Sequence, residues 1–168
     1  KANEPRMFLG AAANPFAEPA EYRASRLGKK VANGADFVQT QIVYNMEKFS
    51  RFMEMVRDLG LDEKVYILAG VTPPRSLGMA RYMKNFVPGM DVPDEIINRL
   101  KGASDKEDEG INICVDIINQ VKVCTLFFQA NCPGSVKCYL IVVQGVFKLL
   151  IFVSSFFERV KLKTYHVF

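Results

Sequence analysis

The sequence has few of the residues that many enzymes use for metal binding or nucleophilic catalysis. It contains a single histidine, His166, and four cysteines among 168 residues. One histidine, near the end of the sequence, argues against a Ser/His/Asp triad and against a histidine-rich metal site. Cys132 and Cys138 are separated by five residues, a spacing that matches no common zinc-binding pattern. We therefore expect no metal centre.

Two further motifs are missing. No Gly-x-Gly-x-x-Gly motif follows a predicted strand, which argues against a dinucleotide-binding Rossmann unit. The first residues, Lys1 to Pro5, are polar, and no signal peptide is visible among them. On this basis we expect a cytoplasmic protein.

Charge and composition divide the chain near Val123. Residues 1–123 contain 17 basic and 17 acidic residues, whereas residues 124–168 contain five basic residues and one acidic residue. The net charge of +4 therefore comes from the second segment, and a neutral main segment gives no reason to expect nucleic-acid binding. The sequence predicts one domain over residues 1–123 and an atypical, hydrophobic and basic tail over residues 124–168.

The pattern of apolar residues predicts strands that alternate with helices. This alternation is typical of a parallel sheet with right-handed crossovers, either part of an α/β barrel or an open doubly wound sheet. The predicted strands span residues 7–13, 34–41 and 65–69, and the predicted helices span residues 18–33, 45–59, 73–85, 94–100 and 110–122.

Gln41 ends the second predicted strand. In α/β barrels the carboxyl ends of the strands carry the chemistry, because side chains there face the mouth of the barrel. A glutamine amide both donates and accepts hydrogen bonds, so it suits the polar edge of a heterocycle. A polar residue that simply ends a strand is the alternative.

Basic residues share one face of the first predicted helix. Arg23, Arg26 and Lys30 are spaced three and four residues apart, with Lys29 beside them. Like charges at this spacing repel one another, so an anion such as a phosphate or diphosphate is a candidate ligand. Solvent alone is the alternative.

Several segments together resemble the methylenetetrahydrofolate reductase family. The resemblance covers roughly residues 7–122, the C-terminal half of the family's barrel, and it rests on the order and the spacing of the motifs. These motifs are residues 8–16 (FLGAAANPF), 26–30 (RLGKK), 34–41 (GADFVQTQ), 67–73 (ILAGVTP), 92–96 (VPDEI) and 109–111 (EGI).

The resemblance implies part of a (β/α)8 TIM barrel that binds flavin. It also implies flavin-dependent reduction of 5,10-methylenetetrahydrofolate to 5-methyltetrahydrofolate. The cofactor is FAD or FMN, and the electron donor is NAD(P)H or a partner reductase subunit. By their positions in the family's motifs, five residues are expected to bind the cofactor: Ala13, Asn14, Arg26, Lys29 and Lys30.

The same resemblance implies a folate site. Gln41 matches the glutamine that binds the pterin, and Tyr44 matches an aromatic residue three positions later. Met79 and Met83 occupy the positions of a glutamine and a phenylalanine on the family's folate-contacting helix. The family's proton-donating glutamate precedes the matched segment, so no catalytic residue is named in this chain.

Two interpretations of the function follow. The chain is either a fragment of the reductase or a truncated, non-catalytic product that binds flavin or pterin and associates with a membrane through its tail. A partial barrel leaves strand edges open, which favours a homo-oligomer or a partner chain.

The tail contains a long apolar run. Residues 139–157 include only one lysine and one glutamine, and this length is near that needed to span a bilayer. Three interpretations are open. The tail is a mistranslated or misjoined sequence, a buried pair of strands that replaces the missing barrel wall, or a membrane anchor.

Overall fold

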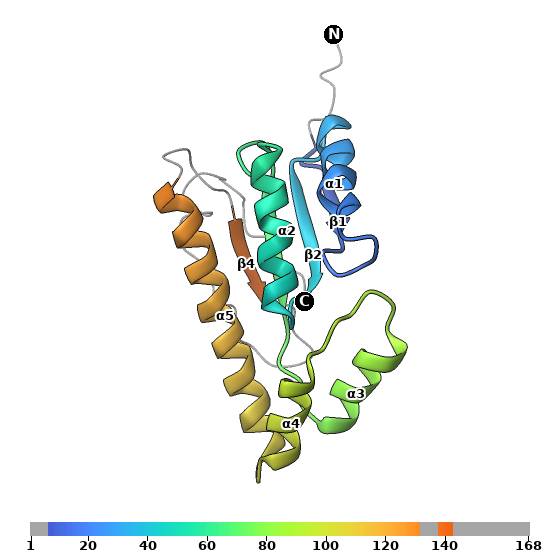
Figure 1. The fold of residues 1–168 in the computed structure, drawn as a ribbon, viewed down its shortest axis with the longest axis vertical. Coiled ribbons are helices and arrows are strands. Elements are labelled where there is room, and N and C mark those ends of the chain that lie inside the picture. Colours follow the sequence, from blue (N-terminus) through green and yellow to red (C-terminus); the bar gives the residue numbers. More distant parts are fainter. Residues whose placement is uncertain (1–6, 132–137, 143–168) are drawn as a thin grey trace.

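A computed structural model describes residues 7–131 and 138–142 of the chain. Strands and helices alternate in it, as the sequence predicts (Figure 1). The predictions for His166, Cys132 and residues 143–168 lie outside the described residues. The elements are β1 (Gly10–Ala13), α1 (Tyr22–Ala32), β2 (Phe37–Ile42), α2 (Met46–Asp58), β3 (Tyr66–Val71), α3 (Leu77–Phe86), α4 (Asp94–Gly102), α5 (Lys106–Asn131) and β4 (Cys138–Val142).

The four strands form one parallel sheet in the order β1-β2-β3-β4. Ala12 pairs with Gln39 on β2, which in turn pairs with Leu68 on β3. Chain order and spatial order are the same, which is the arrangement of consecutive strands in an α/β barrel. The described sheet is therefore consistent with part of such a barrel.

The core lies between one face of the sheet and the helices α1, α2 and α5, which run beside the strands in Figure 1. Successive side chains of a strand point to opposite faces, so Val38 is buried in this core whereas its neighbour Gln39 is exposed. The helices contribute large side chains at helical spacing. Leu27, Phe49 and Ile113 are almost completely buried.

The helices α3 and α4 lie beyond the carboxyl ends of the strands, at the lower end of Figure 1. We expected the first of them to begin at Pro73-Pro74, and this is wrong. It begins after Ser76, whose Oγ accepts a hydrogen bond from the backbone N–H of Met79 at 3.1 Å. A serine in extended conformation satisfies a free N–H of the first turn, and so it fixes the start of α3.

Two other predicted helix starts also move. The helix expected over residues 18–33 begins only at Tyr22, because residues 14–21 form a loop. The helix expected over residues 110–122 begins at Lys106, after Asp105 accepts hydrogen bonds from two N–H groups of its first turn. This helix continues through residue 123, so the change in composition there falls inside α5. The division into residues 1–123 and 124–168 stays a prediction.

Only part of the predicted tail falls within the described residues. The strand β4 pairs with β3 along its whole length, with Cys138 opposite Ile67 and Val142 opposite Val71. Among residues 7–131 and 138–142, no helix is both long and apolar enough to cross a membrane. The three interpretations of the tail depend on residues beyond this range, and they stay predictions.

Candidate functional site

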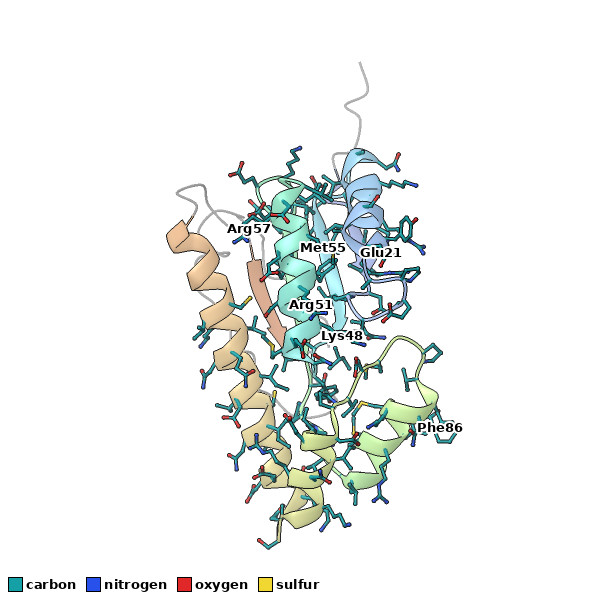
Figure 2. The ribbon with its side chains drawn as sticks, in the orientation of Figure 1. Glu21, Lys48, Arg51, Met55, Arg57 and Phe86 are labelled. Atoms are coloured by element: carbon teal, nitrogen blue, oxygen red, sulfur yellow. The ribbon has the colours of Figure 1, made fainter. Side chains whose placement is uncertain are left out.

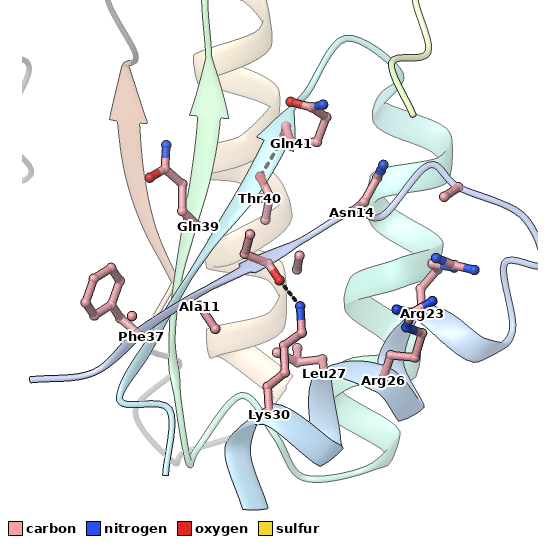
Figure 3. Close-up of a pocket in the computed structure, with 14 residues that line it drawn as sticks. Ala11, Asn14, Arg23, Arg26, Leu27, Lys30, Phe37, Gln39, Thr40 and Gln41 are labelled. Carbon is pink, nitrogen blue, oxygen red and sulfur yellow. Dashed lines mark hydrogen bonds between the residues drawn. The ribbon is translucent and has the colours of Figure 1, made fainter. Parts of the chain in front are cut away.

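A cavity of about 720 Å³ lies along β1, between this strand, α1 and β2 (Figure 3). It brings together five of the residues predicted from sequence, and these come from β1, the loop after it, α1 and β2. They are Ala13, Asn14, Arg26, Lys30 and Gln41. The predicted cationic helix and the predicted amide therefore line one space.

The α1 side of the cavity is positively charged. Arg23, Arg26 and Lys30 all line it, and no aspartate or glutamate is among the described residues of its wall. Arg23 donates hydrogen bonds to the carbonyl oxygens of Glu18 and Pro19, at 2.8 and 3.1 Å, so it holds the loop that leads into α1. The guanidinium of Arg26 makes no hydrogen bond or ion pair within the described part of the chain. It is therefore available to an anion.

Lys30 reaches across to the edge of the sheet, where its ammonium donates a hydrogen bond to the carbonyl oxygen of Ala12 (Figure 3). The carbonyl of Leu9 accepts from β2, and successive carbonyls of a strand point to alternate sides. The Ala12 carbonyl thus points away from β2, to the outer edge of β1. A lysine at this edge covers a group that would otherwise be open to pairing with another strand. An ammonium has three donors, so Lys30 can hold Ala12 and an anion together.

Gln41 lies at the carboxyl end of β2. Its Oε1 accepts a hydrogen bond from the N–H of Ile42 at 3.1 Å. This bond orients the amide but leaves both hydrogens of Nε2 and one lone pair of Oε1 for a ligand. Thr40, the preceding residue, points the other way, and its buried hydroxyl accepts from the N–H of Gly70 at 3.1 Å. This bond joins β2 to β3, and the Thr40 hydroxyl also donates to the carbonyl oxygen of Gln41 at 2.9 Å, so Thr40 fixes the backbone at Gln41.

Small residues form the β1 wall of the cavity. A Cβ atom on Gly10 would overlap the ring of Phe37, so any larger residue there would have to displace that ring. Ala11, Ala12 and Ala13 follow it and add little bulk, which leaves the strand backbone accessible to a ligand. Asn14 ends the run, and its Oδ1 accepts from the N–H of Phe16 at 3.0 Å.

Three predicted substrate residues lie outside this cavity. The Tyr44 ring is buried, and its hydroxyl donates to the carbonyl oxygen of Thr72 at 2.8 Å and lies 3.9 Å from the sulfur of Met83. Burial, with a smaller contribution from Cys114, raises the pKa of Tyr44. Met83 is buried in the same core, and Met79 packs against it. Their role in substrate binding stays a prediction that the cavity does not support.

Lys29 is also placed elsewhere. It lines a second, shallower hollow on α1 with Arg26, Lys30 and Asn33, and it is not part of the cavity wall. Adjacent residues of a helix are about 100° apart around its axis, so Lys29 and Lys30 do not face the same way. A role for Lys29 in cofactor binding stays a prediction.

Several residues of the cavity wall were not among the predicted site residues, and one of them, Gln39, is polar and lies on the same strand as Gln41. Gln39 lines the cavity and is exposed. It lies two residues before Gln41 on β2, and residues two apart on a strand share a face. The alternation of side chains along the strand could therefore have predicted that Gln39 lies on the same face as Gln41.

Outside the cavity, the described residues form no metal site and no reactive cysteine site. Among the described residues, no three histidine, cysteine, aspartate or glutamate side chains are grouped in a way that could hold a metal ion. Burial raises the pKa of the Cys114 thiol to about 11, so this cysteine is a neutral core residue near neutral pH.

Comparison with known proteins identifies the family. Residues 9–131 match the sequence profile of methylenetetrahydrofolate reductases. The chain belongs to the methylenetetrahydrofolate reductase family. A curated relative, methylenetetrahydrofolate reductase 2 of Schizosaccharomyces pombe, is 30% identical over 125 residues, which are 73% of this chain and 19% of that protein.

A solved structure has a similar fold. An uncharacterized protein from Clostridium thermocellum, which binds two copies of 5-methyl-5,6,7,8-tetrahydrofolic acid, superposes with a TM-score of 0.61 at 22% sequence identity. The match covers 82% of this chain and 48% of that protein. The chain of this methylenetetrahydrofolate reductase family member thus spans about a fifth of the curated relative and about half of the structural neighbour.

Proposed function

We propose that this chain supplies flavin- and folate-binding residues for the reduction of 5,10-methylenetetrahydrofolate to 5-methyltetrahydrofolate. One observation carries the proposal: in a member of this family, one cavity is lined by three cations and by the amide of Gln41, with no carboxylate among the described residues of its wall. The cations suit the phosphate groups of FAD or FMN, and the amide suits the polar edge of a pterin. The folate bound by the structural neighbour agrees with this substrate class.

Different residues of the cavity would bind the flavin and the pterin. Arg26 and Lys30 would hold the phosphate end of a flavin, while the small side chains of Ala11 to Ala13 let it approach the strand. The chemistry that a flavin supplies is the transfer of a hydride to the methylene carbon of the folate. Gln41 would orient the pterin through its free Nε2 hydrogens.

The proposal assigns binding, and no proton transfer, to the described residues. No carboxylic acid lines the described cavity wall, so the proton donor is expected from a part of the enzyme outside these residues. NAD(P)H or a partner reductase subunit would provide electrons. A homo-oligomer or a partner chain is also proposed, because a partial barrel leaves strand edges open.

Replacing Gln41 by alanine is expected to weaken binding of 5-methyltetrahydrofolate about two- to tenfold and to leave FMN binding unchanged. The range corresponds to about 0.5–1.5 kcal/mol, the net value of a hydrogen bond between neutral groups. Titration calorimetry with each ligand measures the two affinities separately.

A glutamine outside the cavity provides the control. Gln120 is exposed on α5, so Gln120→Ala should change neither affinity. Equal losses of folate and FMN binding in Gln41→Ala would show that Gln41 only holds the end of β2, and this would contradict its proposed role.

A further inference from the structure

A tight turn between α3 and α4 contacts Asn14, a residue of the cavity wall. The N–H of Met90 donates to the carbonyl oxygen of Val87 at 3.2 Å, with Pro88 and Gly89 between them. Gly89 has a φ of +74°. Proline followed by a residue with positive φ is the pattern of a type II turn, which favours glycine at the third position.

This turn packs directly against Asn14 of the cavity wall. A Cβ atom on Gly89 would overlap the Nδ2 atom of Asn14. The other end of the amide is also fixed, because Oδ1 accepts from the N–H of Phe16. The side chain of Asn14 is therefore held between its own loop and the backbone of Gly89, and any larger residue at position 89 must push it away.

An ion pair holds the turn in this position. Asp91 accepts from the ammonium of Lys48 at 2.7 Å and from Nδ2 of Asn45 at 3.3 Å, both at the start of α2. The hydrogen bond with Asp91 raises the pKa of Lys48. The same ammonium lies 3.9 Å from Glu18, in the loop after β1. Lys48 lies at the end of α2 that faces the α3–α4 segment (Figure 2).

We propose that Gly89 is a positioning residue for the cofactor side of the cavity. The turn around it, fixed by Asp91, sets the orientation of the Asn14 amide. The segment that follows α3 is thereby coupled to the wall of the proposed flavin site. This inference rests on the proposed function for its ligand, but the orientation of Asn14 is measured without any ligand.

Gly89→Ala tests the proposal, and Gly60→Ala is its matched control. Gly60 also has a positive φ, +59°, but a Cβ atom there would meet no atom within 4 Å. Both variants should lower the midpoint of thermal unfolding, because both force alanine into the left-handed region. Only Gly89→Ala should shift the side-chain amide signals of Asn14 in a ¹H–¹⁵N NMR spectrum, and only this variant should weaken FMN binding, by about fivefold or more.

Equal behaviour of the two glycine variants would overturn the proposal, since Gly89 would then serve the turn alone. If the wild-type chain binds no FMN, the proposed function fails, and the amide signals of Asn14 still decide whether the turn positions this residue. If Gly89→Ala does not fold, Asp91→Asn loosens the same turn without a steric clash. Asp91→Asn should shift the Asn14 signals, whereas Glu47→Gln on α2 should not, and unchanged signals in Asp91→Asn would also contradict the proposal.

Discussion

Replacing Arg26 with alanine is expected to weaken the binding of FMN and FAD by roughly 10- to 100-fold. Arg26 lines the cavity and has no other partner in the described part of the chain, so its guanidinium is the cation most available to a phosphate. A hydrogen bond that involves a charged group contributes about 1.5–3 kcal/mol, which corresponds to this range of affinity. Titration of each variant, followed by flavin fluorescence, gives the dissociation constants.

Arg51→Ala is the control for the removal of a positive charge. Arg51 is exposed on α2, and its ion pair is with Glu47, one helical turn away at 3.3 Å. A surface pair of this kind contributes little to stability, and it lies outside the cavity wall. Flavin affinity should stay as in the wild-type protein. A similar loss in Arg26→Ala and Arg51→Ala would mean that flavin responds to net charge and not to the cavity.

Phe49→Ala is expected to lower the free energy of unfolding by about 3–5 kcal/mol. The Phe49 side chain is 0% exposed, in the core between α2 and the sheet. The substitution loses the free energy gained by burying the ring, and it leaves a space that the neighbouring side chains cannot fill completely. Urea denaturation followed by circular dichroism measures the change.

Phe86→Ala makes the same substitution at the surface. Phe86 is 71% exposed at the end of α3 (Figure 2). Its ring contacts that of Tyr82 at a centroid distance of 5.5 Å. Its free energy of unfolding should change by less than about 1 kcal/mol. If both variants lost the same stability, the core would not lie between α2 and the sheet.

Residues that repeat at helical or strand spacing gave the correct elements from sequence. Phe49, Phe52 and Val56 define the inner face of α2, and all three are buried. Asn45 was expected to begin this helix, and its side chain accepts from the N–H of Lys48 at 3.0 Å. These features depend on nearby residues only, so local patterns are enough to predict them.

Features that depend on distant parts of the chain were harder to predict. Tyr44 follows β2, where the path of the loop decides which way a side chain points. Its hydroxyl donates to the carbonyl oxygen of Thr72, inside the core. Lys29 and Lys30 look equivalent in sequence, but only Lys30 lines the cavity. The contact between Asn14 and Gly89 joins segments 75 residues apart, and no local pattern indicates it.

The binding of flavin to the wild-type chain tests the central claim most directly. A cavity that gathers Arg26, Lys30 and Gln41 predicts saturable binding of FMN or FAD that weakens as salt is added, because the phosphate contacts are electrostatic. Flavin fluorescence and absorbance that stay unchanged at every protein concentration, for both FMN and FAD, would contradict the account.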